Sequence, residues 1–354
     1  MKKENILIVS LFYNNGHIGG LMGWYDLLSR VGYTPFFFLD NKYWKHFDDS
    51  FEIIKDEKPD FNKFNILIIN NLSPKDEVTI KYAKRMNKNM KIIFIHHEPW
   101  KGYKEITENL KSSPFVLIKV VIKKMIEKRV LCISDLIICP SENALNIYKK
   151  YEYKYNSNCV VFPLVMKDNS NGTYNTKKHY FSYIATATYE KGIDLFLKFS
   201  KYCHKRNYDI HFSVITKTDI SSYIDESIEK MIQNGYIVVK QGIPLSEEEM
   251  DQAYNDSCCT WLVYRSSTQS GVLPKALMWG SPCIATKVGV FPEIIDGKNG
   301  ILVSSIDSFD EIYQAYKKIK ENQILFQQSA RETYEKIYKV ENRLQEFKKL
   351  LDIL

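Results

Sequence analysis

Short, wholly apolar segments alternate with helix-like segments along almost the whole chain, and this alternation constrains the fold most. The first apolar segment covers residues 5–11 (NILIVSL) and is followed by glycines at positions 16, 19 and 20. A helical spacing of apolar residues then covers 21–31 and stops at Gly32. Continuous apolar runs of this length are typical of parallel strands that are buried on both faces. The alternation therefore predicts an α/β chain with mostly parallel sheets.

The same pattern appears twice along the chain. In the first half, further strands are expected at 34–39, 65–69, 91–95 and 135–139. In the second half, strands are expected at 180–187, 209–215, 236–240, 258–263, 282–286 and 300–303. Helices are expected there at 191–206, 222–233, 246–255 and 272–279, and from Phe309 to the end. Ser246 and Glu249 have the spacing of a capping box at one of these helix starts.

A polar stretch at 167–178 (KDNSNGTYNTKK) separates the two series and is the best domain boundary. A length of 354 residues suits two domains of ordinary size. We expect a first domain over 1–163 and a second over 164–338. Two α/β domains in tandem would leave a cleft between the carboxyl ends of their sheets, where such folds bind ligands.

The net charge indicates which classes of partner the protein can bind, and the cysteine content indicates its cellular compartment. The net charge of +7 favours anionic partners such as nucleotides, but no nucleic-acid-binding motif is present, so we expect no nucleic acid. The seven cysteines are odd in number, form no C-x-x-C pair and lie mostly in apolar runs, which predicts buried thiols in a reducing compartment. The N-terminus leads straight into a strand, and no apolar run reaches the ~18 residues of a membrane span. We expect a cytosolic protein, or one peripheral to a membrane on its cytoplasmic face.

The segment 115–130 (FVLIKVVIKKMIEKRV) has two interpretations. Its apolar residues are interleaved with lysines and an arginine, a composition typical of helices that lie on anionic membranes. A helix packed on the sheet with a cationic outer face would have the same composition. The sequence leaves both interpretations open.

A small-residue loop precedes one helix of the second half. Gln269, Ser270 and Gly271 come directly before the helix expected from Val272. Backbone N–H groups without partners at a helix start, together with the helix dipole, form an anion site. Gly271 would allow a ligand to approach the backbone closely. A diphosphate would fit such a site.

Residues 264–303 resemble the donor-binding half of the GT-B glycosyltransferases of family 4. That family carries Ala-x-x-x-Gly-x-Pro-x-Ile-Ala-Thr, then Gly, then Glu-Ile-Ile-x-Asp-Gly-x-x-Gly-x-Leu-Val. The matching residues are Ala276, Gly280, Pro282, Ile284, Ala285, Thr286, Gly289, Glu293, Ile294, Ile295, Asp296, Gly297, Gly300, Leu302 and Val303. Weaker likeness covers residues 184–195, Gly19 and Gly20, 135–143 and 330–338, and it is weakest between 40 and 90.

The resemblance implies two Rossmann-like domains whose parallel sheets face a central cleft, with a C-terminal helix, 339–354, that completes the first domain. It implies transfer of a sugar from a nucleotide-sugar donor to a glycan or polyprenyl-linked acceptor, with retention of configuration, in the synthesis of a surface polysaccharide or glycolipid. It also implies a reaction without metal or cofactor, and the sequence has no Asp-x-Asp metal motif.

In the second domain, Lys191 matches the family lysine that neutralises the donor diphosphate, and Gly19 and Gly20 of the first domain match a glycine pair near the phosphates. Thr186 stands where the family has an arginine, and Arg265 is a candidate to replace it. Ser267 and Lys275 stand where the family has two glutamates. Lys275 cannot accept hydrogen bonds from a ribose, but it could meet a phosphate. The loop therefore resembles a variant that reads Gln-Ser-Gly-Val-Leu and holds the donor by backbone and hydroxyl groups.

In the first domain, the motif His96-His97-Glu98-Pro99-Trp100 follows a buried strand at its carboxyl end. The resemblance implies that a histidine here contacts the donor sugar or the acceptor, and His97 is the first candidate. His96 and Trp100 are candidate acceptor contacts, and Glu98 is a candidate acceptor contact or base. His17, in the first glycine loop, is a further acceptor candidate.

Two other functions remain open. A nucleotide-sugar epimerase of the same architecture would need several acid and base carboxylates in the cleft, which the sequence does not display. A catalytically degenerate GT-B subunit would bind a sugar nucleotide or a partner transferase, and Thr186 and Lys275 keep this alternative alive. Donor hydrolysis without acceptor separates it from an active transferase.

Overall fold

The computed structural model describes residues 4–102, 114–170, 178–242 and 246–354, and it divides into two compact units. The first unit comprises 1–167 and 340–354, and the second comprises 168–339. These borders lie beside the expected ones at 163/164 and 338/339. Part of the expected boundary stretch, residues 171–177, lies outside the described residues.

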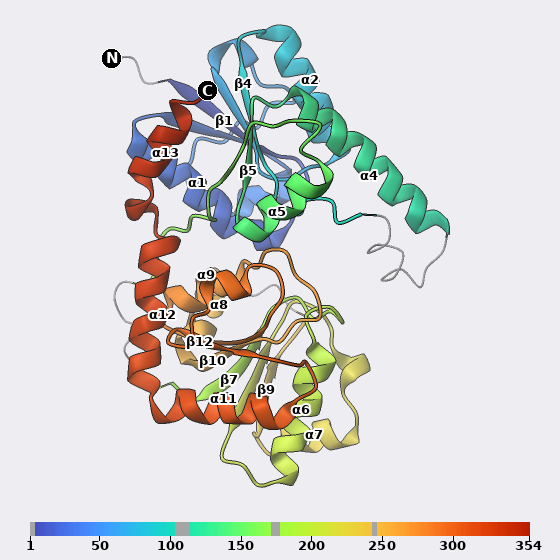
Figure 1. Cartoon of the computed structure of the whole chain (residues 1–354), viewed down its shortest axis with the longest axis vertical. Coiled ribbons are helices and arrows are strands. Elements are labelled where there is room, and N and C mark those ends of the chain that lie inside the picture. Colours follow the sequence, from blue (N-terminus) through green and yellow to red (C-terminus); the bar gives the residue numbers. More distant parts are fainter. Residues whose placement is uncertain (1–3, 103–113, 171–177, 243–245) are drawn as a thin grey trace. The chain divides into compact units, whose positions relative to one another are not determined.

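The first unit contains the elements labelled β1, β4, β5, α1, α2, α4, α5 and α13 in Figure 1. It is built on a six-stranded parallel sheet with the order β2-β1-β3-β4-β5-β6. The strands are β1 (Asn5–Ser10), β2 (Thr34–Leu39), β3 (Ile66–Ile69), β4 (Lys91–Ile95), β5 (Leu136–Cys139) and β6 (Cys159–Val161). The helices are α1 (Ile18–Val31), α2 (Pro74–Met86), α4 (Pro114–Ile133), α5 (Glu142–Tyr151) and α13 (Leu344–Leu351). One apolar core joins one face of the sheet to α1 and α13, and a second joins the other face to α2, α4 and α5.

The second unit has a six-stranded parallel sheet with the order β12-β11-β10-β7-β8-β9. Its strands are β7 (Tyr180–Ile184), β8 (His211–Ile215), β9 (Ile237–Lys240), β10 (Ser257–Leu262), β11 (Cys283–Thr286) and β12 (Gly300–Val303). Its helices are α6 (Ile193–Lys205), α7 (Glu226–Gln233), α8 (Glu247–Asp256), α9 (Val272–Met278), α10 (Phe291–Ile294), α11 (Phe309–Glu321) and α12 (Gln323–Ile337). The two-domain α/β class expected from the alternation is confirmed.

Local chemistry explains where the expected helices begin and end. Ser246 and Glu249 form the expected capping box of α8. α7 begins at Glu226 rather than 222, because the Asp225 side chain caps it by accepting a hydrogen bond from the Ile228 backbone N–H. α1 begins at Ile18 rather than 21, so Gly19 and Gly20 lie in its first turn and not in the preceding loop. Among the described residues, no helix has both the length and the apolar character that a membrane crossing requires.

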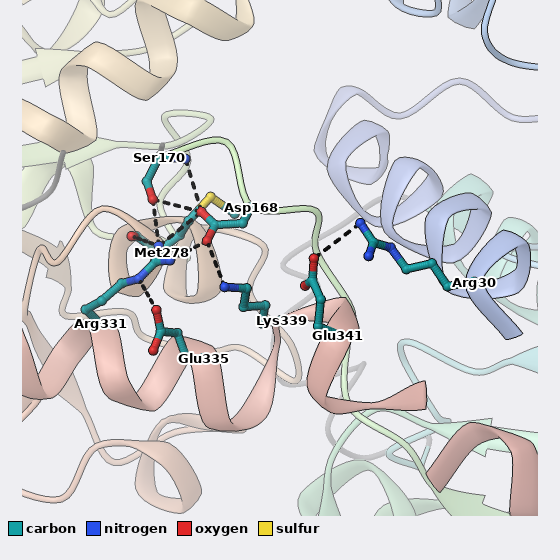
Figure 2. A network of polar contacts seen from close by, with 8 residues as sticks. All are labelled: Arg30, Asp168, Ser170, Met278, Arg331, Glu335, Lys339 and Glu341. Carbon is teal, nitrogen blue, oxygen red and sulfur yellow. Dashed lines mark hydrogen bonds and ion pairs between the residues drawn. The ribbon is translucent and has the colours of Figure 1, made fainter. Parts of the chain in front are cut away.

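A polar cluster joins the first residue of the second unit to the last part of that unit (Figure 2). Asp168, at its start, pairs with Arg331 of α12 and with Lys339, the last residue of the unit, at 3.5 Å. The Arg331 Nη1 also donates to Ser170 Oγ at 2.7 Å and to the Met278 carbonyl at 2.8 Å. In the first unit, an exposed pair joins Arg30 of α1 to Glu341 at 3.2 Å (Figure 2).

Candidate functional site

The strand order of the second unit predicts where a ligand binds. The chain leaves β7 towards one edge of the sheet and returns at β10, next to β7, to build the other half. β7 and β10 are therefore the switch-point pair, and ligands of such sheets bind outside the carboxyl ends of that pair. The loops that leave these two ends are residues 185–192 and 263–271. They contain six of the expected donor residues, namely Thr186, Lys191, Arg265, Gln269, Ser270 and Gly271.

Arg265 fastens these two loops to each other. Its backbone N–H donates to the Glu190 carbonyl at 2.7 Å, and its guanidinium donates to both carboxylate oxygens of Asp194 at 2.7 and 2.8 Å. The guanidinium also stacks over the Tyr189 ring, 3.7 Å from the centroid. Since a bidentate carboxylate pair uses the guanidinium fork, the geometry gives Arg265 a positioning role. The guanidinium that was expected to replace the missing arginine is thus engaged by Asp194 and Tyr189.

Two glycines allow the loops to pack closely. Gly192, at the start of α6, has φ of 71°, and a β-carbon there would lie 2.7 Å from the Val263 carbonyl oxygen. Gly289 has φ of 55°, and a β-carbon there would lie 2.6 Å from the Ser267 carbonyl oxygen. Left-handed backbone and close approach both favour glycine at these positions. Gly289, two residues before α10 (Phe291–Ile294), therefore packs directly against the backbone of the 266–271 loop.

Lys191 and Gln269 lie in these loops with side chains that are partly exposed. The Lys191 backbone N–H donates to Thr188 Oγ1 at 3.3 Å, which shapes the turn before α6. The Gln269 Nε2 is buried and has no hydrogen-bond partner within the described part of the chain. Thr186 is exposed, Ser270 is buried, and Gly271 is the N-cap of α9 without a side-chain cap, so that Val272 begins that helix as expected.

Lys275 lies in a different environment from the one expected for a phosphate contact. Its ammonium pairs with Glu247 of α8 and lies 3.8 Å from Asp251 Oδ1. Two carboxylates on a neighbouring helix already compensate its charge, so this position ties α9 to α8. The pairing partners precede Lys275 by 28 and 24 residues, and no sequence pattern indicated them.

The first unit has a polar pocket of about 390 Å³ formed by the loops after β1, β3 and β4. His17, Asn71, Ser73, His97 and Glu98 are among the residues that line it. β1 and β3 are neighbours at the point where this sheet changes direction, so this pocket also lies at a switch point. The structure therefore brings together four of the residues expected from sequence, namely His17, His96, His97 and Glu98.

His97 is held as a neutral ring. Its ring centroid lies 5.1 Å from that of His17, and the ring donates a hydrogen bond to the Asn70 backbone carbonyl. Burial, and then repulsion from His17, lower the pKa of His97 to about 3. The other nitrogen, Nε2, is buried and lacks a partner among the described residues. A neutral ring that donates through one nitrogen accepts through the other, so His97 can receive a hydrogen bond from a substrate hydroxyl.

His96 belongs to an interior charge cluster. Its Nε2 lies 2.8 Å from Glu152 Oε2 and 3.5 Å from Glu127 Oε1, and Lys124 pairs with both carboxylates. The Trp100 backbone N–H donates to Glu152 at 3.1 Å, and its ring lies under the Lys124 ammonium, 4.9 Å from the centroid. His96 and Trp100 thus hold the loop after β4 in place, and this geometry does not favour the expected acceptor contacts.

His96, Glu127 and Glu152 are residue types that can bind a metal ion, and their ligand atoms lie within 4.8 Å of one another. This is the one such group of three within the described ranges. Burial raises the pKa of Glu152, but the hydrogen bonds from His96 and Lys124 outweigh burial and lower it to about 2. The Lys124 ammonium therefore supplies the positive charge that these carboxylates need. Nothing in the sequence indicated Lys124, Glu127 and Glu152. His96 and Glu152 are 56 residues apart in the chain and meet only in the folded structure.

Comparison with protein families identifies the second unit. Residues 178–322 match the family described as glycosyl transferases group 1. The second unit is a group 1 glycosyl transferase domain. The matched range includes both loops of the switch point, with Lys191, Arg265 and Gln269. A search of curated proteins found no match.

Solved structures share the architecture of the whole chain around this glycosyl transferase domain. HepE of Anabaena in complex with UDP-glucose is 12% identical, with a TM-score of 0.70 over 99% of this chain and 100% of that chain. Sucrose-phosphate synthase of Thermosynechococcus elongatus is 12% identical, with a TM-score of 0.68 over 99% and 98%. A glycosyltransferase of Rickettsia africae is 13% identical, with a TM-score of 0.67 over 100% and 99%. The fold is GT-B, as the resemblance implied.

Proposed function

We propose that the protein is a nucleotide-sugar-dependent glycosyltransferase of the hexosyltransferase type, which moves a sugar to a glycan or polyprenyl-linked acceptor in the synthesis of a surface polysaccharide or glycolipid. The observation that carries the proposal is the pair of interlocked loops at the β7/β10 switch point, which lie inside the family match. We propose a retaining reaction that needs no metal or cofactor, at the cytoplasmic side.

In this proposal the second unit binds the donor. The Lys191 ammonium neutralises the departing diphosphate, and the backbone and side chains of Gln269, Ser270 and Gly271 hold the nucleotide, with Thr186 and Val272 beside them. A charge-assisted contact that forms in the transition state contributes about 1.5–3 kcal/mol. In the first unit, Gly19 and Gly20 offer backbone N–H groups in the first turn of α1, where a phosphate can bind.

The first unit then orients the sugar and the acceptor. His97 receives a hydrogen bond from a substrate hydroxyl through Nε2, and its low pKa keeps it uncharged near the diphosphate. Glu98 is exposed at the same pocket and serves as an acceptor contact or base, and His17 is a further contact. Transfer requires that the substrates held by both units meet at the reacting carbon.

A non-catalytic GT-B subunit is the second candidate. Two observations favour it: Lys275 is committed to Glu247 and Asp251, and the guanidinium of Arg265 is committed to Asp194. The second unit then offers fewer cations to a departing diphosphate than the family pattern supplies. Such a subunit would bind the nucleotide sugar without hydrolysing it.

Nucleotide binding should appear as thermal stabilisation. We expect one of UDP, GDP, ADP, CMP and dTDP to raise the melting temperature by a few °C at about a hundredfold excess over Kd, where ligand binding contributes about 2.7 kcal/mol. UDP comes first, since the HepE structure of the same fold holds UDP-glucose. Gly289→Val should abolish the shift, because its side chain would displace the Ser267 carbonyl.

The matched control is Gly235→Ala, which also has left-handed backbone, at φ of 72°, but has no atom within 4 Å of the added carbon. It should melt earlier and keep the nucleotide shift. Absence of any shift in the unmodified protein at millimolar nucleotide would refute the transferase and the binding subunit alike. If a nucleotide does raise the melting temperature, hydrolysis of the donor without acceptor separates an active transferase from a binding subunit.

We also propose that α4 lies on an anionic membrane, as one interpretation of 115–130 implies. Ile118, Val121, Ile122 and Met125 follow helical spacing and are each about half exposed. Lys123 and Lys128 are exposed beside them. An exposed apolar stripe flanked by cations matches the surface of an anionic bilayer.

Vesicle sedimentation tests this surface. The protein should bind vesicles that contain one quarter phosphatidylglycerol several-fold more strongly than pure phosphatidylcholine vesicles. Ile122→Glu should weaken that binding about tenfold or more, since it removes apolar burial and adds repulsion. Leu325→Glu, at an apolar site on α12 that is 66% exposed against 50% for Ile122, should leave it unchanged. Equal binding by both variants would refute the proposal for α4.

A further inference from the structure

A second cavity of the first unit lies outside the polar pocket and has no role in the proposed chemistry. It measures about 810 Å³, which is within the usual range for small-molecule sites. The carboxyl end of β2, the segment 40–61 and α2 enclose it. It shares only Pro74 with the polar pocket, so the two are different sites of the same unit.

The walls of this cavity are apolar and aromatic. Phe38, Trp44, Phe61 and Tyr82 line it together with aliphatic side chains, including Val78. Val78 and Tyr82, on one face of α2, are 66% and 37% exposed, although they sit in a concave surface. Phe61 and Tyr82 pack edge to face with centroids 5.7 Å apart. Exposed apolar concavities of this kind mark binding sites.

The rim is polar and rich in carboxylates. Asp40, Asp56 and Glu57 line the cavity, with Lys58 and Lys75 on the same rim. Lys58 already lies over the Tyr82 ring, 5.3 Å from its centroid. The carboxylates offer acceptors for hydroxyl groups and disfavour an anionic ligand.

Trp44 adds a donor that lacks a partner. Its indole Nε1–H is buried and has no hydrogen bond among the residues that the structure describes. An unpaired buried donor is costly, and a ligand oxygen that reached it would relieve that cost. A hydrocarbon chain offers no such oxygen, whereas a sugar ring offers one at nearly every carbon.

We propose that this cavity binds an uncharged sugar unit of the acceptor, at a distance from the hydroxyl that reacts. A sugar combines apolar C–H faces for the aromatic walls with hydroxyl groups for Asp40, Asp56 and Glu57, and with oxygens for the Trp44 donor. The proposal rests on the proposed function and specifies its acceptor as a glycan. The cavity lies within residues 11–82, outside the family match at 178–322.

Saturation-transfer NMR tests the proposal with methyl β-glucoside, lactose, cellotriose and maltotriose as probes, and with octanoate as the hydrocarbon probe. We expect transfer to sugar ring protons, with Kd in the millimolar range, and none to octanoate. Trp44→Phe keeps the ring and removes only the N–H, and it should weaken binding about two- to tenfold, as loss of one hydrogen bond does. Tyr82→Ala should weaken it at least as much, and alanine is favourable within a helix.

Met86→Ala is the matched control, because Met86 is exposed on α2 one turn beyond Tyr82 and does not line the cavity. It should bind the sugars as the unmodified protein does. Sugar signals that survive both Trp44→Phe and Tyr82→Ala would overturn the proposal, as would no signal from any sugar at 50 mM or a signal from octanoate alone. The thermal shift by nucleotide should persist in Tyr82→Ala, so failure here is distinguishable from failure of the proposed function.

Discussion

Arg331→Met should lower the free energy of unfolding by about 3–5 kcal/mol, the usual cost of removing one partner from a buried ion pair. Arg331 is only 4% exposed and neutralises Asp168 while it donates to Ser170 and the Met278 carbonyl (Figure 2). The variant would leave the Asp168 carboxylate with the hydrogen bonds from Ser170 and with the Lys339 ammonium, 3.5 Å away. Urea denaturation followed by circular dichroism measures the loss.

Arg30→Met is the control, since Arg30 also makes two ion pairs but is 43% exposed. Exposed pairs contribute about 1 kcal/mol or less, so this variant should unfold almost as the parent does. The double variant Asp168→Asn/Arg331→Met should recover part of the loss, because position 168 then carries no charge that has lost its guanidinium partner. Equal losses for Arg331→Met and Arg30→Met would show that the buried cluster contributes no more than a surface pair.

The same pair gives a pH dependence. Burial would raise the pKa of Asp168, but hydrogen bonds from Arg331 and Ser170 outweigh burial and lower it to about 2. An unfolded aspartate has a pKa near ~3.9. A pKa that is lower in the folded protein stabilises above the unfolded value, and the contribution is lost as pH falls towards 2. The difference between Arg331→Met and its parent should therefore be constant above about pH 5 and narrow below pH 4.

Lys191→Ala should reduce sugar transfer about ten- to a hundredfold, because the ammonium is proposed to stabilise the departing diphosphate. The lysine follows a turn fixed by Thr188 and precedes Gly192, whose backbone packs on the Val263 carbonyl. The loop is therefore rigid enough to place a charge. Release of the nucleotide diphosphate, assayed with the donor chosen by the thermal-shift screen, measures the effect.

Lys198→Ala serves as the control, since Lys198 lies on the same α6 and is exposed beside Asp194. It removes one charge from the same helix and should keep the full rate. A rate for Lys191→Ala within twofold of the parent would remove Lys191 from the mechanism and leave the loops with a binding role alone. Arg265→Lys should also slow transfer, although less directly, because it loosens both loops.

Most of the fold could be predicted from the alternation of apolar runs and helical patterns. β2 and β4 have the bounds expected from sequence, and α8 begins at its capping box. Errors fell at element ends, where single contacts decide. Asp225 delays the start of α7, and the left-handed Gly192 delays α6 to Ile193. The expected strand 180–187 stops at Ile184, where the chain leaves the sheet to form the first loop of the switch point.

The candidate site was predictable only in part. The motif 96–100 indicated the right loop, but two adjacent histidines look alike in sequence. Both histidines line the polar pocket, but the His96 Nε2 pairs with Glu152 and Glu127, while the His97 Nε2 has no partner among the described residues. Side chains alternate along an extended segment, so only the packing on each side decides which of the two can meet a substrate.

By itself, the sequence determined the two α/β units, the loops that carry Lys191 and Gln269, and the family of the second unit, because periodicity and local motifs depend on neighbours along the chain. Only the tertiary structure decided which charges pair: Arg265 with Asp194, Lys275 with Glu247, and Arg331 with Asp168. It also decided the cavity that Trp44 and Tyr82 line. The paired charges lie 28 to 163 residues apart. Electrostatic pairing depends on distance in space, which no local pattern records.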